Sequence, residues 1–297
     1  MPDYSVFGLT LRLPFDDLTI PAAAAGSVPD VELIEDEVPR DLCEPVAAGD
    51  GWQVAAGQYL RCGSAGSGRF LVDGPDRIVF QRSPTADQAL VAFIVLHDVM
   101  AAVLRHRGDL VLHANAILTG SGNGAGAIAI SGVSGSGKST TTARLLEAGG
   151  SLITDDLTVL RTIPAGGVEV QPGVGEIHLT DESVVALGVD TAGLPRYPWR
   201  AKTAVPFPAA VAGGSQPLRD IYLLTVADVP DVTVTRQSGA ALFDALQDCI
   251  YGPLLPTDAP RVFGLQAQVC QSVRVWRIQR PRSGWSLEDV AEVILYR

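Results

Sequence analysis

The chain has 297 residues, of which 47% are hydrophobic and 19% charged, and it carries a formal net charge of −11. This composition excludes an intrinsically disordered chain, and the length allows one large or two small domains with a substantial buried core. The acidic charge repels nucleic-acid phosphates, which argues against a nucleic-acid partner.

The cysteines and the N-terminus indicate the compartment. Four scattered cysteines form no CxxC pair, which is typical of reduced thiols rather than of disulfides or a metal site. The N-terminal run MPDYSVFGLTLRLPFDD lacks the basic segment and long apolar run of a signal peptide. The apolar stretch Ala89 to Leu104 is shorter than the roughly 20 residues of a membrane span. We therefore expect a cytoplasmic protein without a membrane partner.

Residues 1–88 consist of short alternating runs separated by Gly, Pro and Asp, a pattern that favours strands. A GSAGSG run between two of them predicts a flexible hairpin loop. Residues 1–88 are therefore expected to form a β-rich N-terminal lobe, and residues 89–297 a catalytic domain. The expected strands are Ser5 to Leu13, Asp30 to Ile34, Trp52 to Val54, Tyr59 to Cys62, Arg69 to Val72 and Arg77 to Phe80.

The pattern changes after the lobe. Thr85 to Arg107 has apolar residues at helical spacing and predicts one long helix that ends at Gly108. The order that follows is strand, SGNGAG loop, buried strand, Gly-rich loop, helix and strand, which predicts an α/β nucleotide-binding unit with a parallel sheet. These elements are expected at Leu110 to Leu118, Ala127 to Ser131, Lys138 to Ala148 and Ser151 to Thr154.

The remaining chain alternates strands and helices. Leu194 to Ala210 is rich in Pro and basic residues and is expected to be a loop. Ser286 is expected to cap the C-terminal helix. The other expected strands are Val168 to Gln171, Gly175 to Leu179, Asp220 to Val226, Val232 to Arg236 and Val273 to Ile278. The other expected helices are Thr180 to Leu187, Gly239 to Tyr251, Val262 to Cys270 and Leu287 to Leu295.

The Gly-rich loop has the sequence GVSGSGKS and matches the phosphate-binding pattern G-x-x-x-x-G-K-[ST]. The glycines let successive backbone N–H groups point at phosphate oxygens, Lys138 reaches the β- and γ-phosphates, and the Ser139 hydroxyl ligates Mg²⁺. A chance Gly/Ser loop in a chain with 31 glycines is the alternative, but the flanking strand and helix argue against it. The predicted nucleotide-binding residues are Gly132, Ser134, Gly135, Ser136, Gly137, Lys138, Ser139 and Thr140.

Acidic and basic residues near this loop are candidates for catalysis. Asp155 and Asp156 end the next strand, where an acid can hold Mg²⁺ or act as a base; an acidic turn is the alternative. His113 lies in an apolar strand, where a histidine is more often a core residue than a catalytic one. The basic run from Arg196 to Lys202 can clamp phosphate charge, with Lys202 favoured, or can be a solvated loop.

The runs LHANAI and GAIAISGVSGSGKSTTTARLLEAGGSLITDDLTVL resemble the catalytic core of the HPr kinase/phosphorylase family. The similarity is closest to stand-alone HPr-kinase-like proteins, including kinases of lasso-peptide precursors, and YSVFGLTLRL and PLRDIYLL extend it. It is strongest over residues 108–160 and covers most of the chain. The resemblance implies a P-loop kinase core of the type shared with ATP-dependent phosphoenolpyruvate carboxykinases.

The resemblance also implies roles for individual residues. His113 matches the family histidine near the transferred phosphate, Asp155 the general base, and Asp156 a hydrogen-bonding or metal-supporting residue. Glu176 matches a glutamate near Mg²⁺. The bifunctional enzymes carry E-I-R-G-L-G, whereas the run here is EIHLTD, without the arginine and both glycines. This departure argues against phosphorylase activity and against recognition of HPr.

Together these features predict a kinase that uses ATP and Mg²⁺ to phosphorylate a hydroxyl, with Ser on a peptide or small protein as the expected acceptor. Two alternatives stay open. One is a metabolic small-molecule kinase or carboxykinase-like enzyme, and the other is a non-catalytic nucleotide-binding sensor. The resemblance makes a homo-oligomer possible, but the sequence contains no signal that specifies one.

Overall fold

The computed structural model describes residues 1–16, 18, 20–63, 66–120, 126–164, 166–197, 199, 201–207, 214–253 and 258–297. The chain divides into two compact units. Unit 1 comprises Met1–Val111 and Tyr251–Leu265, and unit 2 comprises Leu112–Ile250 and Gln266–Arg297. The chain is a mixed α/β protein with several sheets, which confirms the expected α/β class.

Unit 1 contains an eight-stranded sheet of order β1-β2-β3-β8-β7-β6-β5-β4. The five strands expected between residue 13 and residue 88 are present, as β3 and β5 to β8. β4 is an additional strand that was not expected from the sequence. Residues 64 and 65 of the expected hairpin loop lie outside the described residues. The strands are β1 (Asp3–Val6), β2 (Leu9–Arg12), β3 (Val31–Glu35), β4 (Ala47–Gly49), β5 (Trp52–Ala55), β6 (Gln58–Cys62), β7 (Gly68–Asp73) and β8 (Arg77–Arg82).

The single strand expected from Ser5 to Leu13 is wrong, because the chain reverses there. β1 and β2 pair antiparallel, and Val6 is opposite Leu9. The two residues between them, Phe7 and Gly8, have φ angles of 56° and 70°. Such a two-residue turn matches the twist of a hairpin. Phe7 tolerates the left-handed conformation because its ring is fully buried in the core, a tertiary constraint that alternation does not show.

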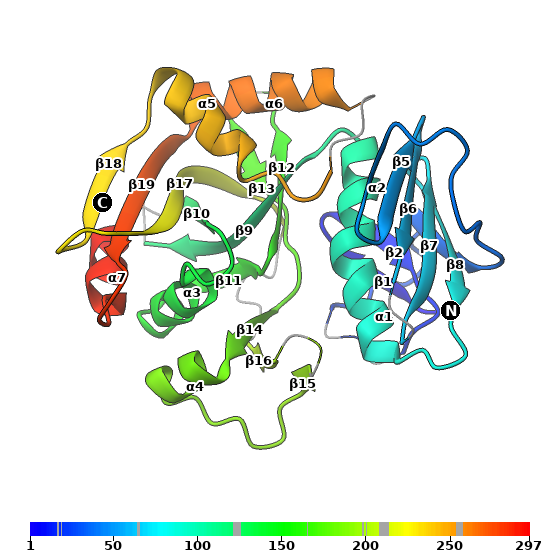
Figure 1. Cartoon of the computed structure of the whole chain (residues 1–297), viewed down its shortest axis with the longest axis horizontal. Coiled ribbons are helices and arrows are strands. Elements are labelled where there is room, and N and C mark those ends of the chain that lie inside the picture. The colour runs from blue at the N-terminus through cyan, green and yellow to red at the C-terminus, as the bar shows by residue number, and fades with distance from the viewer. Residues whose placement is uncertain are drawn as a thin grey trace. The chain divides into compact units, whose positions relative to one another are not determined.

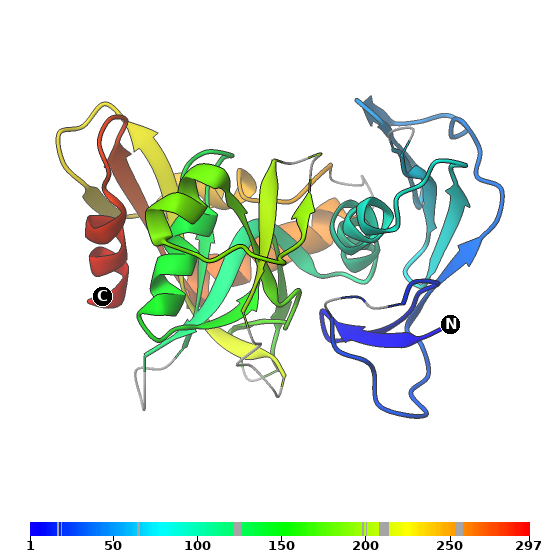
Figure 2. The same ribbon diagram turned by 90° about the horizontal axis from the view of Figure 1, so that it is seen from below.

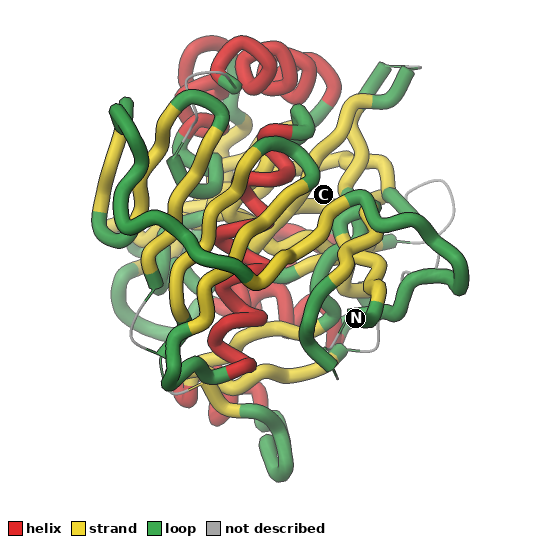
Figure 3. Tube along the Cα trace, turned by 90° about the vertical axis from the view of Figure 1, so that its right-hand side faces the viewer, coloured by secondary structure: helices red, strands yellow, loops and turns green. Residues whose placement is uncertain are grey.

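The long helix expected from residue 85 is present from Gln88 to His106. It consists of α1 (Gln88–Ile94), a π-helical turn (Val95–Val99) and α2 (Met100–His106). The Asp87 carboxylate caps it by accepting from Leu90 N at 2.9 Å. By length and apolar composition this helix could cross a membrane, but 72% of it is buried within the fold, as in a core helix. Figures 1 and 3 show it running along one face of the unit 1 sheet.

Polar contacts join this helix to the sheet and to the returning segment 251–265. The Asp98 carboxylate accepts from Arg61 Nε of β6 at 3.0 Å and from the Tyr251 hydroxyl at 2.9 Å. Arg105, which is buried, donates to the Tyr251 carbonyl. The compact unit therefore extends past the expected boundary between residues 1–88 and 89–297, to Val111.

Unit 2 contains a mixed sheet of order β10-β9-β12-β13-β17-β19-β18, in which β11 also pairs with β9 and β10 with β17. β10, β17 and β19 run parallel, whereas β9 and β18 are antiparallel to their neighbours. The expected parallel pairing is therefore present for β10, β17 and β19, but the sheet as a whole is mixed. The strands are β9 (Leu110–Thr119), β10 (Gly126–Ser131), β11 (Ser151–Thr154), β12 (Leu157–Thr162), β13 (Val168–Val170), β17 (Gln216–Ala227), β18 (Thr233–Arg236) and β19 (Arg274–Pro281).

A second sheet, of order β14-β16-β15, contains the strand expected at Gly175 to Leu179 and two strands, β15 and β16, in the region expected to be a loop from Leu194 to Ala210. β14 (Glu176–Thr180) pairs with β16 (Lys202–Pro206), which pairs with β15 (Arg196–Tyr197). The inner residues of β16 are buried, and Pro206 stands at the strand end, where a missing N–H is tolerated. The basic and Pro-rich composition concealed this strand. Residues 198, 200 and 208–213 of the expected loop lie outside the described residues.

The helices of unit 2 are α3 (Lys138–Glu147), α4 (Asp181–Leu187), α5 (Gly239–Gln247) and α7 (Leu287–Leu295), while α6 (Ala259–Ser272) spans both units. α5 ends before the expected Tyr251, because Ile250 bridges Leu112 and the Cys249 carbonyl accepts from His113 N at 2.7 Å. α3 and α7 lie side by side (Figure 2). Ser286 precedes α7 as expected, but its side chain makes no capping bond.

A buried carboxylate joins β17 and β19 where their pairing begins, at Asp220 and Arg274. The Asp220 side chain is 1% exposed and accepts from Arg274 at 2.8 Å, from Arg219 Nε at 2.7 Å and from Trp276 Nε1 at 2.9 Å. Because every donor lies on one of these two strands, the carboxylate holds the parallel pair together at its N-terminal end.

Asp220→Ala is expected to lower the free energy of unfolding by about 2–4 kcal/mol, since it leaves the Trp276 N–H without its acceptor and two guanidinium groups without their anion. Both guanidinium groups are partly exposed and regain water, so the loss stays below that of a fully buried pair. Urea denaturation measures it. Asp228→Ala, at an exposed position near the end of the same segment, is the control and should change stability by less than about 0.5 kcal/mol. Equal effects of the two substitutions would contradict this account of Asp220.

Candidate functional site

The site is organised by β9, which lies between β10 and β11. Ala116 of β9 is opposite Ala129 of β10 on one side and Thr154 of β11 on the other. Both partners are antiparallel to β9, so β10 and β11 run in the same direction and end at nearby positions along it: Ser131 is opposite Ala114, and Thr154 is opposite Ala116. The Gly-rich loop that follows β10 and the two aspartates that follow β11 therefore emerge on either side of β9, beside its middle residues.

The loop after β10 turns on three glycines with positive φ angles. Gly132, Gly135 and Gly137 have φ angles of 155°, 81° and 102°. A Cβ at Gly132 would lie 2.3 Å from the Leu224 carbonyl oxygen, so only glycine fits there. Lys138 Nζ donates to the Gly132 carbonyl at 2.5 Å, which folds the side chain back over the loop. The loop leads into the N-terminus of α3, whose free N–H groups favour an anion.

The two aspartates form a strained turn between β11 and β12. Asp156 has a φ of 63°, in the left-handed region that Asp adopts only occasionally. Leu157 N donates to the Asp155 carbonyl at 2.7 Å, which tightens the turn, and Asp156 N donates to Asn115 Oδ1 at 3.1 Å. The turn points the two carboxylates in different directions, as interruptions of strand pairing near functional sites often do.

A chain of hydrogen bonds connects this turn to the Gly-rich loop through β9. His113 Nε2 lies 3.2 Å from Asp156 Oδ1, and the His113 carbonyl accepts from Ser131 Oγ at 2.9 Å. Two residues along β9, Asn115 Nδ2 donates to Thr142 Oγ1 at 3.1 Å. Thr142 Oγ1 in turn donates to the Lys138 carbonyl at 2.9 Å, in the first turn of α3. The acidic turn and the loop are thus fixed relative to each other.

Asp155 points into the protein interior. Its side chain is 2% exposed, and Oδ2 accepts from His178 N at 3.1 Å. Burial, reinforced by the neighbouring Asp156 charge, raises the pKa of Asp155 to about 6. Oδ1 is buried and has no hydrogen-bond partner among the described residues. Asp155 is therefore a buried carboxylate whose ionised form is disfavoured, although the nearby His178 and Lys202 oppose the shift of its pKa.

Glu176 of β14 is buried beside His178. Its carboxylate is 3.2 Å from His178 Nε2 and accepts from the Tyr197 hydroxyl at 3.3 Å. The Tyr197 ring also meets the His178 ring edge to face at 5.2 Å. Glu176, His178 and Tyr197 form a packed polar cluster on the three-stranded sheet.

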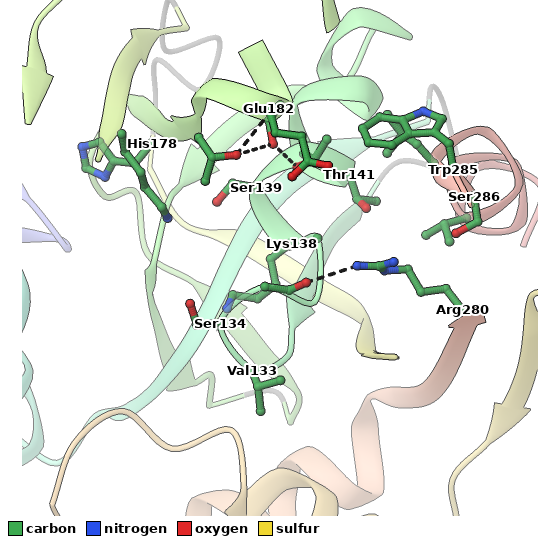
Figure 4. Close-up of a pocket in the computed structure, with 18 of the residues that line it drawn as sticks. Val133, Ser134, Lys138, Ser139, Thr141, His178, Glu182, Arg280, Trp285 and Ser286 are labelled. Carbon is green, nitrogen blue, oxygen red and sulfur yellow. Dashed lines mark hydrogen bonds between the residues drawn. The ribbon is translucent and has the colours of Figure 1, made fainter. Parts of the chain in front are cut away.

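A cavity of about 500 Å³ opens over the loop and the acidic turn. This volume lies within the range of small-molecule sites. Figure 4 shows Lys138 and Ser139 between His178 on one side and Trp285 on the other. Of the residues predicted from the sequence, the wall contains His113, Ser134, Gly135, Gly137, Lys138, Ser139, Thr140, Asp156 and Lys202. The predicted residues outside the wall are Gly132, Ser136, Asp155 and Glu176.

Sequence reasoning missed the wall that the end of β19 and the start of α7 supply. Arg280 Nε donates to the Ser136 carbonyl at 2.8 Å and Nη2 to the Gly135 carbonyl at 3.1 Å, so one guanidinium group holds the loop from outside. Arg282 and Trp285 continue this wall. The run RPRSGW after an apolar segment was a signal, but only the parallel pairing of β17 with β19 brings it to the loop.

The residues present fit a phosphate group and a divalent cation. Among the described residues, the buried Ser136 hydroxyl within the loop has no hydrogen-bond partner, and Asp155 Oδ1 has none either. The Ser139 hydroxyl and the carboxylates of the acidic turn are oxygen ligands, the type that Mg²⁺ prefers. Glu176 is already engaged by His178 and Tyr197, so it fits a supporting role at such a site better than direct ligation.

Comparison with known proteins gives a distant likeness. No protein-family model matches the chain, and no curated protein matches it. Among solved structures, the chain is similar to the Hpr(Ser) kinase/phosphatase from Coxiella burnetii, with 14% sequence identity, coverage of 63% of this chain and 91% of that chain, and a TM-score of 0.31. The likeness extends at most to a distant HPr-kinase-like fold, and no residue role or activity rests on it.

The buried charge of Asp155 predicts a pH-dependent effect of Asp155→Asn. The pKa of this carboxyl rises from 3.8 to about 6, so its contribution to stability is full below pH 3.8 and is lost as the pH rises through 6. Asparagine cannot ionise. The unfolding free energy of the variant minus that of the unmodified protein should therefore rise by about 1–3 kcal/mol between pH 4 and pH 7.

Urea denaturation at several pH values, with EDTA and without nucleotide, measures this difference. Asp190→Asn, at an exposed position, is the control and should show no such rise. If the difference for Asp155→Asn stays constant with pH, Asp155 does not titrate in this range.

Proposed function

We propose that unit 2 is a phosphotransferase that binds ATP with Mg²⁺ in the cavity and transfers the γ-phosphoryl group to a hydroxyl. The observation that carries this proposal is the hydrogen-bond chain from Asp156 through Asn115 and Thr142 to Lys138. The chain joins the backbones of Asp156 and Lys138, whose side chains line the same cavity with a carboxylate and an ammonium group. Phosphoryl transfer needs both: positive charge on the phosphate and an acceptor for the hydroxyl proton.

The loop supplies the phosphate contacts. Backbone N–H groups of the loop and the Lys138 ammonium surround the β- and γ-phosphates, and Lys138 exchanges its bond to the Gly132 carbonyl for a phosphate oxygen. The Ser139 hydroxyl would hold Mg²⁺ beside the acidic turn, and the ion would supply positive charge that neutralises the phosphates. Electrostatic contributions of this kind are typically worth about 3–4 kcal/mol of barrier each.

We assign the proton acceptor to Asp156 rather than to Asp155. Asp156 lines the cavity and is paired with His113, whereas Asp155 is buried behind it. The acceptor hydroxyl oxygen bonds to the γ-phosphorus, the bond from phosphorus to the β–γ bridging oxygen breaks, and the hydroxyl proton passes to the Asp156 carboxylate. This assignment exchanges the two roles that the family resemblance implies.

The acceptor end of the cavity contains Lys202 and His178 beside Asp156. Among the described residues of the basic run, Lys202 lines the cavity, whereas Arg196 pairs with Asp181 on an exposed face. Lys202 can stabilise the phosphoryl group during transfer. Ser on a peptide or small protein remains the proposed acceptor, and its support is the sequence resemblance over residues 108–160.

A small anionic substrate is the second candidate, because Lys202, Arg280 and Arg282 add cationic groups to the wall. Arg280, however, donates to two loop carbonyls, and Arg282 follows it on the same side. Lys202 is then the one basic side chain of the described wall at the acceptor end, apart from the histidines. This arrangement favours a neutral hydroxyl over a dicarboxylic acid.

Incubation with γ-labelled ATP, Mg²⁺ and a pool of Ser-containing peptides tests the proposal. The intact protein should label peptide, and Asp156→Asn should lower the rate by about 10²–10⁴-fold while nucleotide binding persists. Asp155→Asn should lower it less, because that carboxylate does not reach the cavity. Mass spectrometry identifies the labelled residue.

Asp228→Asn is the control and should label peptide at the normal rate. Nucleotide binding without labelling of any peptide or small metabolite would favour a nucleotide sensor and contradict the proposal. A greater loss in Asp155→Asn than in Asp156→Asn would return the base to Asp155.

A further inference from the structure

The cavity continues beyond the loop, away from the acidic turn, to a wall that the proposed phosphoryl transfer does not use. Its residues come from the turn after β19 and the first turn of α7, and they are Arg282, Gly284, Trp285, Ser286 and Leu287. Figure 4 shows Trp285 and Ser286 on the side of Lys138 opposite His178. A triphosphate held by the loop has one end at Asp156, so its other end faces this wall.

Trp285 is unusual for a side chain of its size. It is 55% exposed, although burial of an aromatic ring is strongly favourable. Gly284, with a φ of 85°, turns the chain immediately before it. The indole therefore presents an exposed, flat face to the cavity. Covering such a face with another planar ring is favourable, because it removes apolar surface from water and allows the two rings to stack.

Ser286 provides an independent observation. Its side chain is 8% exposed and lines the cavity, yet Oγ has no hydrogen-bond partner among the described residues. It stands at the N-cap position of α7, where a serine normally accepts from a helix N–H, but no such bond forms. A buried hydroxyl without a partner costs free energy, which a polar ligand atom in the cavity would recover.

Arg280 fixes the position of this wall relative to the phosphate loop. Its guanidinium group binds the Gly135 and Ser136 carbonyls, and Trp285 follows only five residues later. The wall therefore moves with the loop rather than independently of it. A ligand group on Trp285 and a phosphate on the loop are held at a constant separation.

We propose that Trp285 and Ser286 form the nucleoside end of the site: the indole stacks on the base, and the Ser286 hydroxyl bonds to a polar atom of the base or the ribose. This inference rests on the proposed function, because it requires a triphosphate on the loop. Stacking tolerates any base, so the site recognises a planar nucleobase without strong selection among purines.

Binding of Mg-ATP and of Mg-tripolyphosphate, which has no nucleoside, tests this assignment by calorimetry. Trp285→Ala should weaken Mg-ATP binding by about 10- to 100-fold and leave Mg-tripolyphosphate binding unchanged. Trp285→Phe should retain most of the affinity for Mg-ATP. Trp199→Ala, which removes another exposed tryptophan of unit 2, is the matched control and should change neither.

Fluorescence gives a second readout. Mg-ATP should change the tryptophan emission of the intact protein and of Trp199→Ala, and the change should be absent in Trp285→Phe. If Trp285→Ala weakens the binding of Mg-ATP and of Mg-tripolyphosphate equally, or weakens neither, the assignment is overturned. The proposed function would still stand, because the intact protein binds both ligands. If the intact protein binds neither ligand, the proposed function fails, and this inference fails with it.

Discussion

The site depends on one strand being paired on both sides. β9 lies between β10 and β11, and because both partners are antiparallel to it, they run in the same direction and end at nearby positions along it, opposite Ala114 and Ala116. No contact between the loop and the aspartates is needed to bring them together. The side chains of β9 then complete the arrangement, since His113 contacts the acidic turn and Asn115 contacts both that turn and α3. A one-residue slip of β9 would turn both side chains to the opposite face of the sheet and separate the two halves of the site.

This arrangement is costly for the fold. Asp155 is a buried carboxylate with a raised pKa, Asp156 has a left-handed backbone, and the loop excludes any side chain at Gly132. Such features persist only where the surroundings hold them in place, and they concentrate at functional sites. Here the hydrophobic core of unit 2 does so: Ile117, Ile128 and Ile130 of the central strands are fully buried together with Leu145 of α3. These features of the site lower the stability of the fold, and the hydrophobic core around them offsets that loss.

Local patterns explain what the sequence could predict. The strand before the Gly-rich loop, the helix after it and most strands of the N-terminal lobe depend on neighbours within about ten residues, and these elements are present. The Phe7–Gly8 turn, β16 and the early end of α5 depend on tertiary contacts, and the sequence missed them. The π-helical turn at Val95–Val99 has no local signal that we recognise.

The sequence likewise predicts only part of the candidate site. The motif and the two aspartates were visible in the sequence, but their orientation was not: only the positive φ of Asp156 decides which carboxylate faces the cavity. Arg280 and Trp285 lie more than 140 residues from the loop, and the parallel pairing of β19 with β17 brings them to it. A single sequence contains no record of that pairing.

The central claim is that one triphosphate occupies the loop while Mg²⁺ and the acidic turn lie beside it. Calorimetry with a non-hydrolysable ATP analogue tests it most directly, because binding is measured without an acceptor. The account predicts a single site per chain whose affinity requires Mg²⁺ and falls by at least tenfold in Lys138→Ala. An absence of binding heat, or equal affinity in the intact protein and Lys138→Ala, would contradict it.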